Sequence, residues 1–285
     1  MSVVDHGHAA VAAQGSAQPA IIVEGVTKVF RRNGLDTHAL DRMDLELSAG
    51  EFVSIVGPSG CGKSTLLRII AGLLPPSEGR VMMNGQVITG PQTNLGIVFQ
   101  NAVLVDWRTV LGNVLLQTDI RGLPTAQYVS PARALLAAVG LGGFEDRYPY
   151  ELSGGMRQRA AIVRALIHDP PLLLMDEPFG ALDALTREQM RLDLEALWLA
   201  TKKTVVFITH SVDEAVLLSD RVIVMSPRPG RIERVFTIDL PRPRGLDRRK
   251  HPVFHATTEE ITGIFLAKGV LFDRVGRLQI AESDG

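Results

Sequence analysis

Residues 51–65 read Glu51-Phe-Val-Ser-Ile-Val-Gly57-Pro-Ser-Gly-Cys-Gly-Lys63-Ser64-Thr65, and this stretch decides the fold of the 285-residue chain. Its first apolar residues predict a short strand, and Leu66-Leu-Arg-Ile-Ile-Ala-Gly-Leu73 after it has the pattern of a helix. A glycine-rich turn between a strand and a helix lets backbone N–H groups face an anion at the positive end of the helix. The stretch therefore predicts an α/β protein that binds the phosphates of a nucleoside triphosphate.

The whole turn is expected to bind the cofactors ATP and Mg²⁺. Lys63 is predicted to bridge the β- and γ-phosphates and to take part in catalysis, and Ser64 is predicted to ligate the metal. Cys61 fills a position that needs a small residue, and a redox-sensing thiol beside the nucleotide is the alternative. The residues expected to line the phosphate site are Gly57, Pro58, Ser59, Gly60, Cys61, Gly62, Lys63, Ser64 and Thr65.

A second predicted strand, Leu172-Leu-Leu-Met, ends in two acids, Asp176 and Glu177. Ligands bind at the carboxyl ends of strands in open α/β sheets, so both acids are candidates for the site. Because successive strand residues point to opposite sides, the two carboxylates need different roles. Asp176 is predicted to hold Mg²⁺ through water, and Glu177 to polarise the attacking water as general base.

Short Val- and Ile-rich runs alternate with amphipathic segments along most of the chain, which indicates an α/β architecture with an antiparallel β addition. The runs LLLM and VVFI are typical of parallel strands buried on both faces. No internal repeat is visible, so one ATPase unit is expected. The predicted strands are Ile21–Phe30, Met43–Leu47, Phe52–Val56, Leu95–Phe99, Leu172–Met175, Val205–Ile208 and Arg221–Met225. The predicted helices are Lys63–Ala71, Pro131–Val139, Gly155–Ile167, Leu185–Ala200 and Val212–Leu218.

Composition limits the possible classes of protein. With 46% hydrophobic residues and a net charge of −1, the chain has enough apolar residues for a full core and no general nucleic-acid-binding character. Its single cysteine excludes an internal disulfide. The longest charge-free stretch, Val81–Val105, contains amide side chains and Pro91, which a bilayer core would not tolerate. A role in transport would therefore require a membrane partner.

Both ends of the chain differ in amino-acid composition from its middle. Residues 1–19 are predicted to be a disordered leader, 20–235 the ATPase domain, and 236–285 a C-terminal linker and helical extension. Within Pro227–Pro252, proline and basic residues are frequent, and we expect a solvated linker or an edge hairpin. A nucleic-acid or lipid-headgroup patch is the alternative. A last amphipathic helix, at about Thr257–Ala267, is expected to pack back onto the body.

The segment Leu152-Ser153-Gly154-Gly155-Met-Arg-Gln-Arg159 predicts a helix that Ser153 caps and that begins at Gly154 or Gly155. Such an end presents free N–H groups to an anion, although an ordinary capped helix explains the segment equally well by itself. Together with the phosphate loop and the Asp176–Glu177 pair, the segment strongly resembles the signature of ABC ATPases. The resemblance covers about Ile21 to Arg231.

This resemblance implies a P-loop NTPase fold with a mixed central sheet, an antiparallel β subdomain and a helical signature subdomain. Phe30 resembles the aromatic that stacks on adenine; a core strand residue is the alternative. Gln100 matches the glutamine that, as one of the metal residues, senses Mg²⁺ and the attacking water, and that links the site to the membrane partner. Asp183 matches the aspartate that communicates between subunits, and His210 the switch histidine that contacts the γ-phosphate.

The resemblance also implies a homodimer in which two subunits stack head to tail. Ser153, Gly154 and Gly155 would then act on the ATP that is bound at the partner's phosphate loop. The same family pattern places the protein peripherally on the cytoplasmic face of the inner membrane.

Three segments resemble the corresponding segments in the ATPases of importers of the nitrate/sulfonate/taurine type: PFGALDALTR, LSGGMRQR and SDRVIVMSPRPGRI. That branch implies a separate integral-membrane permease and, indirectly, an extracytoplasmic substrate-binding protein, with no nucleic-acid partner. One departure is Leu104-Val-Asp106-Trp107, where relatives commonly carry Leu-Pro-Trp, and it concerns the coupling to the permease. The alternatives are the ATPase of a two-component exporter and a non-transport ABC ATPase of DNA repair or translation. The solute remains open among nitrate, sulfonates, taurine, aromatic acids and vitamin precursors.

Overall fold

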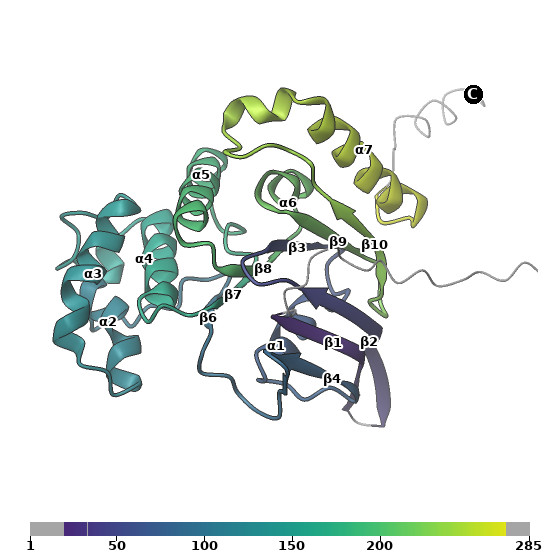
Figure 1. Ribbon diagram of the computed structural model, residues 1–285, viewed down its shortest axis with the longest axis horizontal. Helices are drawn as coiled ribbons and strands as arrows, with labels where there is room; N and C mark the ends of the chain where they lie inside the picture. The colour runs from purple at the N-terminus through teal and green to yellow at the C-terminus, as the bar shows by residue number, and fades with distance from the viewer. Residues whose placement is uncertain (1–19, 33, 272–285) are drawn as a thin grey trace, which may run out of the picture.

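The computed structural model describes residues 20–32 and 34–271, so the predicted leader at 1–19 and the end of the predicted extension, 272–285, lie outside the described residues. Within these residues the strands form a four-stranded and a six-stranded sheet. Helices cover the larger sheet, and a separate group of helices stands at one side of it (Figure 1). None of the described helices is both long and apolar enough to cross a membrane.

The six-stranded sheet has the order β10-β9-β3-β8-β7-β6. All neighbouring pairs from β9 to β6 are parallel, and β10 runs antiparallel at the edge. Every residue of β3 and β8 is buried, as the near-continuous apolar runs predict for strands covered on both faces. The strands are β3 (Phe52–Val56), β6 (Gly96–Val98), β7 (Leu172–Asp176), β8 (Thr204–Thr209), β9 (Arg221–Met225) and β10 (Ile232–Thr237).

The four-stranded sheet is antiparallel, in the order β2-β1-β4-β5. Helix α1 (Lys63–Ile70) lies between the two sheets, because Leu66 and Ile70 share one buried cluster with Val23 of β1 and Ile55 of β3. This cluster joins the antiparallel sheet to one face of the larger sheet. The strands are β1 (Ile21–Arg32), β2 (Leu35–Leu47), β4 (Glu78–Met83) and β5 (Gln86–Val87).

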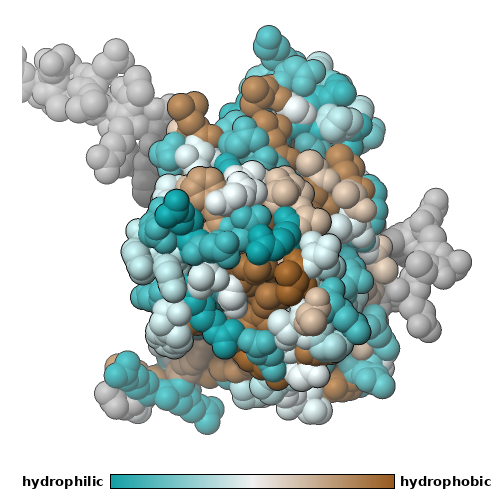
Figure 2. Space-filling view, turned by 90° about the vertical axis from the view of Figure 1, so that its left-hand side faces the viewer, coloured by the Kyte–Doolittle hydropathy of each residue, from teal (hydrophilic) through white to brown (hydrophobic). Residues whose placement is uncertain are grey.

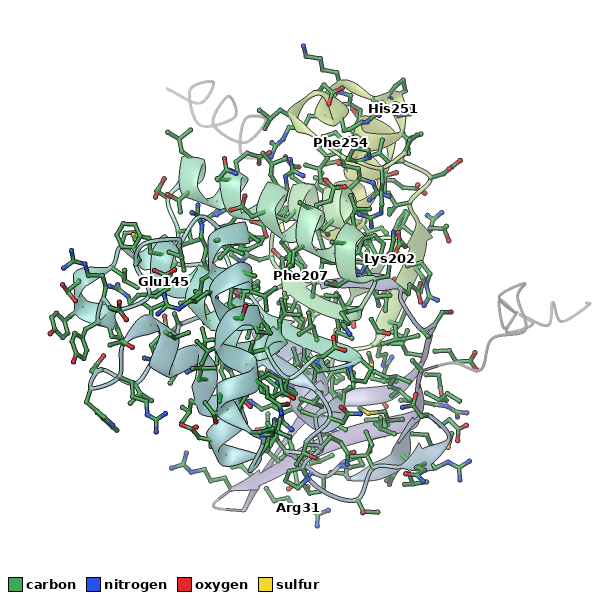
Figure 3. The ribbon with its side chains drawn as sticks, turned by 60° about the vertical axis from the view of Figure 1, so that its left-hand side comes forward. Arg31, Glu145, Lys202, Phe207, His251 and Phe254 are labelled. Atoms are coloured by element: carbon green, nitrogen blue, oxygen red, sulfur yellow. The ribbon has the colours of Figure 1, made fainter. Side chains whose placement is uncertain are left out.

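The opposite face of the larger sheet is covered by α5 (Ala184–Thr201), α6 (Val212–Leu218) and α7 (Pro252–Ala267). Phe207 of β8 packs with Phe52 and Trp198 under α5, whereas Phe254 belongs to the cluster between α6 and α7. Figure 3 shows Phe207 in the middle of the body and Phe254 near the start of α7, apart from it. Because side chains alternate along β3, Val53 and Ile55 pack into the cluster around α1, whereas Phe52 and Val56 pack into clusters on the opposite face.

A helical segment of α2 (Val110–Ile120), α3 (Thr125–Ala138) and α4 (Gly154–Leu166) has its own buried cluster. A single 3₁₀ turn, η1 (Pro149–Glu151), leads into α4. The sequence did not predict α2, and it predicted α3 only from Pro131. The helix begins at Thr125 and continues through Pro131, although proline usually ends or starts a helix. The helix that we expected at the start of the signature is present, and Ser153 caps it.

The basic segment begins in the turn of the edge hairpin that β9 and β10 form and contains β10, but not all of the segment is solvated. Arg244 is only 2% exposed, which contradicts the expectation of a solvated linker at this position. The segment continues into a 3₁₀ turn, η2 (Leu246–Lys250), and then into α7, which begins at Pro252 rather than at Thr257. Helix α7 packs against α6, so the final helix does lie on the body.

Arg244 satisfies carbonyl groups that the end of α6 leaves open. Its Nη1 donates to the carbonyl oxygens of Val216 at 2.9 Å and Ser219 at 2.7 Å, and its Nε donates to that of Leu240 at 2.9 Å. The last carbonyls of a helix have no partner inside the helix. Burial, and to a smaller extent the charge of Arg242, lowers the pKa of Arg244 to about 10, so the group stays charged at neutral pH.

We predict that Arg244→Met destabilises the protein by about 3 kcal/mol, because several buried carbonyls lose their only strong donor. Urea unfolding of the full chain measures this change. Arg248→Met is the matched control, since Arg248 Nε donates only to the carbonyl of Pro243, at 3.3 Å. An equal effect of both substitutions on the free energy of unfolding would contradict the assigned role of Arg244.

Candidate functional site

The loop between β3 and α1 is wound tightly around Lys63, the first residue of α1. The buried ammonium group donates to the carbonyl oxygens of Gly57 at 2.8 Å and Pro58 at 3.1 Å. Gly62 has a φ of +106°, and a Cβ there would lie 2.7 Å from the carbonyl oxygen of Ala39. The turn therefore needs glycine at this position, both for its conformation and for its approach to β2.

Cys61 belongs to the core below the loop. Its Sγ would lie 2.9 Å from a Cβ on Gly57, and the residue is buried with the cluster around α1. Burial raises the pKa of the Cys61 thiol, which keeps the thiol protonated at neutral pH. Because the thiolate is the reactive form, this environment favours the small packing residue over the redox sensor.

Ser64 and Asp176 meet at the carboxyl ends of β3 and β7. The Ser64 hydroxyl donates to Asp176 Oδ1 at 2.8 Å. Burial raises the pKa of Asp176, and the nearby charge of Glu177 adds to the rise, while the bond from Ser64 opposes it. Two hard oxygen donors, one of them a poorly solvated carboxylate, fit the preference of Mg²⁺ for oxygen ligands.

Glu177 and His210 form a second pair at the same edge of the sheet. Strands β7 and β8 pair Asp176 with Ile208, and the Glu177 N–H donates to the carbonyl of Ile208 at 2.9 Å. The Glu177 Oε2 then lies 3.3 Å from His210 Nδ1. Glu177 has a φ of +47°, a sparsely populated conformation for a residue with a side chain. Such strain at a carboxylate in a candidate site fits a functional role.

Gln100, two residues beyond β6, lies against the turn that follows Glu177. Its Nε2 would be 3.0 Å from a Cβ on Gly180, and the Gly180 N–H donates to the Glu177 carbonyl at 3.0 Å. One residue earlier, the carbonyl of Phe99 accepts a hydrogen bond from Gln158 Nε2 at 3.0 Å. Gln158 is buried in α4, and sequence reasoning missed it. Because Gln158 stands between Arg157 and Arg159, the sequence carried no signal that its side chain would be buried.

The N-termini of α4 and α5 lie side by side. Ser153 Oγ accepts from the Met156 N–H at 3.3 Å, and Asp183 Oδ1 accepts from the Thr186 N–H at 3.0 Å. A Cβ on Gly155 would lie 2.4 Å from Thr186 Cγ2, so only glycine permits this contact. Hydrogen bonds from Thr186 lower the pKa of Asp183, which is therefore a carboxylate at neutral pH.

Phe30 and Ser153 are not joined to these groups. Phe30 lies on β1 in the antiparallel sheet, where its ring is 40% exposed and Lys28 Nζ lies 5.3 Å from its centroid. This exposure argues against the alternative of a core strand residue. Across residues 20–32 and 34–271, no hydrogen bond or ion pair links Ser153 to the phosphate loop. Within the described residues, the candidate signature and the phosphate loop are therefore not bonded to each other.

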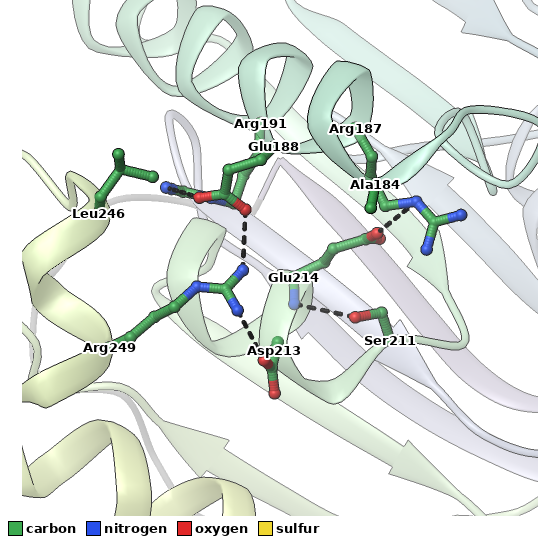
Figure 4. A pocket seen from close by; sticks show the side chains of 9 residues that line it. All are labelled: Ala184, Arg187, Glu188, Arg191, Ser211, Asp213, Glu214, Leu246 and Arg249. Atoms are coloured by element: carbon green, nitrogen blue, oxygen red, sulfur yellow. Dashed lines mark hydrogen bonds and ion pairs between the residues drawn. The ribbon is translucent and has the colours of Figure 1, made fainter.

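A pocket of about 510 Å³ lies between the starts of α5 and α6 and the turn η2, next to His210 in the sequence (Figure 4). Its charged groups pair with one another: Arg249 contacts Glu188 at 2.8 Å and Asp213 at 3.1 Å. Glu214 Oε2 accepts a 2.6 Å hydrogen bond from the Thr209 hydroxyl, and burial raises the pKa of Glu214. These contacts hold the turn that carries His210, and sequence reasoning did not identify them.

Comparison with known proteins extends these observations. The model of the family described as ABC transporter matches residues 40–180. An uncharacterized ABC transporter ATP-binding protein of Methanocaldococcus jannaschii is 54% identical over 222 residues, 78% of this chain and 83% of its own. The taurine import ATP-binding protein TauB of Roseobacter denitrificans is 47% identical over 234 residues, 80% of this chain and 87% of its own.

A solved dimeric structure of MJ0796, a bacterial ABC transporter cassette, is 35% identical with a TM-score of 0.69, covering 76% of this chain and 98% of that one. A second dimeric structure of this cassette, in a post-hydrolysis state with bound ADP and Pi, is 33% identical with a TM-score of 0.66. This second comparison also covers 76% of this chain and 98% of the solved chain. The fold class that we predicted is thus confirmed, and the chain belongs to the ABC transporter family, as one of its ATP-binding and ATP-hydrolysing proteins.

Proposed function

We propose that this protein is the ATPase subunit of an importer, which works as a head-to-tail homodimer and drives a separate permease. One observation carries the proposal. The phosphate loop, the Asp176–Glu177 pair and His210 meet at the carboxyl ends of three neighbouring parallel strands, where Ser64 contacts Asp176 at 2.8 Å and Glu177 lies 3.3 Å from His210. This constellation provides a phosphate cradle, a metal position and a general base at one edge.

The residues of this edge divide the tasks of the proposed reaction among them. Lys63 and the N–H groups of the loop bind the phosphates, and Glu177 accepts the proton of the attacking water. His210 orients Glu177 and reaches the γ-phosphate, and Gln100 reports the state of the site to the membrane partner. Ser64 and Asp176, with Gln100 nearby, hold Mg²⁺, which neutralises charge on the phosphate oxygens when it is bound.

The remaining predicted residues act across the dimer or on the base of the nucleotide. Ser153, Gly154 and Gly155 present the N-terminus of α4 to the ATP held by the partner subunit. The close approach of Gly155 to Thr186, whose N–H bonds to Asp183, places Asp183 near this helix end. Phe30 offers an exposed ring for stacking on adenine. The domain boundary that we expect at residues 235 and 236 stays a prediction.

We assign the contact with the permease to the side of the molecule that carries α2, α3 and α4. Figure 2 shows hydrophobic side chains gathered between hydrophilic ones on this side. The loop before α2 contributes Trp107, which is 81% exposed, and Val103, which is 60% exposed. Exposed apolar side chains of this size mark interaction surfaces. A peripheral position on the cytoplasmic face of the inner membrane follows from this contact.

For the solute we propose a small sulfonate such as taurine, received from an extracytoplasmic binding protein. Relatives 47% and 50% identical to this chain, from Roseobacter denitrificans and Ruegeria pomeroyi, carry the name taurine import ATP-binding protein. The exporter and non-transport alternatives have no comparable support among these relatives.

The role of Glu177 predicts that Glu177→Gln binds ATP with normal affinity and hydrolyses it about 10²–10⁴ times more slowly, because only the base is lost. Phosphate release and nucleotide binding, measured on the same preparation, separate these two effects. Asp169→Asn is a surface carboxylate control. Hydrolysis by Glu177→Gln at the rate of the unmodified protein would show that another group is the base.

The head-to-tail arrangement predicts a specific result for mixed dimers of Ser153→Arg and Lys63→Ala chains. Both lesions then fall in one composite site, so the second site is intact and each mixed dimer should occlude one ATP. Occluded radiolabelled nucleotide per dimer measures this. If each site were built from one chain alone, every site would carry a lesion, and the mixture would occlude none.

The proposed transport role predicts that cells whose chromosomal gene for this chain carries Lys63→Ala lose the uptake of radiolabelled taurine, because the altered ATPase subunit binds ATP poorly. A plasmid copy of the unmodified chain should restore uptake, and alanine uptake should stay unchanged throughout. Unaffected taurine uptake would exclude this solute. Accumulation of a preloaded compound would instead support the exporter.

A further inference from the structure

The turn between β9 and β10, residues 226–231, lies directly against the phosphate loop. A Cβ on Gly230 would come within 2.0 Å of the Cys61 carbonyl oxygen, so the two backbones are in contact. On its other side the turn is bonded to β2: the Gly230 N–H donates to Ala39 at 3.0 Å, and the Asp41 N–H donates to Gly230 at 3.0 Å. The turn is therefore fixed between β2 and the loop.

Arg228 extends from this turn onto the phosphate loop. Its Nε donates to the carbonyl oxygen of Gly60 at 3.1 Å. Its Nη2 would lie 3.0 Å from a Cβ on Gly60, so any side chain at that position would press on the guanidinium. Gly60 has a φ of +75°, which suits glycine and leaves room for Arg228.

The partner of Arg228 is a backbone carbonyl, as are the side-chain partners of Arg244 and Arg248, whereas the other arginines of this basic segment have carboxylate partners. The carboxylate pairs are Arg231 with Asp41, Arg234 with Glu260, Arg242 with Asp220 and Glu195, and Arg249 with Glu188 and Asp213. Arg228 has no carboxylate within ion-pair distance in the described part of the chain. Its charge is therefore left uncompensated beside a loop whose ligand is an anion.

We propose that Arg228 is a positioning residue of the nucleotide site, which orients the Gly60–Cys61 peptide for phosphate binding. In a trans peptide the C=O and N–H groups point in opposite directions, so a donor on the Gly60 carbonyl turns the Cys61 N–H away from Arg228. That N–H points into the loop, where it donates to the Pro58 carbonyl at 3.3 Å. The phosphates would replace the Pro58 carbonyl as the acceptor of this N–H, whose direction Arg228 fixes in advance. This inference rests on the proposed role of the loop in binding ATP.

The hydrogen bond can be separated from the charge by substitution. Glutamine places its Nε2 at the same number of bonds from Cα as arginine Nε, so Arg228→Gln keeps the donor and loses the charge. Arg228→Met has a similar length and loses both. Calorimetric titration of the full chain with Mg-ATP and with Mg-ADP measures the dissociation constants.

We expect Arg228→Met to raise the dissociation constants of both nucleotides about tenfold, which is the effect of losing one hydrogen bond from a charged donor. The dissociation constants of Arg228→Gln should stay within about threefold of those of the unmodified protein. The KM for ATP should rise in Arg228→Met with little change in kcat, because the loop and not the reacting groups is affected. Arg248→Met is the matched control, since its Nε also donates to a carbonyl, that of Pro243, but away from the loop. It should bind both nucleotides normally.

Equal affinities of Arg228→Met and Arg228→Gln would overturn the proposal, and so would an equal loss in Arg248→Met. Thermal unfolding without nucleotide shows whether each variant is folded. If Arg228→Met does not fold, Arg228→Ala replaces it, and failure of both to fold would make Arg228 a structural residue and the proposal wrong. Absence of ATP binding by the unmodified protein would contradict the proposed function itself, which is a separate result.

Discussion

Hydrogen bonding among β3, β8 and β7 brings the candidate catalytic side chains Lys63, His210 and Glu177 to one edge of the sheet. These strands are parallel and in register, so the residues that follow them arise at the same edge. Burial on both faces prevents the strands from slipping, because a shift of one residue would turn apolar side chains toward the wrong cluster. The contacts from Ser64 to Asp176 and from Glu177 to His210 are consequences of this register.

The sequence predicted the features whose physical cause is local. The glycine-rich turn between β3 and α1, the acids at the end of β7 and the cap of α4 each depend on neighbouring residues, and the structure has them where we expected them. The sequence did not predict the strands β4 and β5. It also did not predict α2, whose apolar residues do not lie on one face. The burial of Arg244 could not be predicted either, because its partners are carbonyl groups that only the folded chain brings together.

Strain and close packing are concentrated where the chain approaches the candidate site. Glu177 adopts a positive φ, and Gly155 and Gly230 allow contacts that no side chain would permit. The ion pairs of Arg249 with Glu188 and Asp213, and the hydrogen bond from Thr209 to Glu214, stabilise the turn that carries His210. Rigid support on one side and exposed groups on the other are what a site needs if its ligand arrives together with a second subunit.

The cluster between α6 and α7 has a consequence for the synthesis of the protein. It contains Val56, the last residue of the strand that leads into the phosphate loop, together with Phe254 and Phe265 of α7. A ribosome releases the chain from its N-terminus, so β3 leaves the ribosome long before α7 exists. The face of β3 that carries Val56 must therefore stay uncovered until α6 and then α7 have been made. The strand that leads into the phosphate loop is encoded early, but the helices that support it are encoded late.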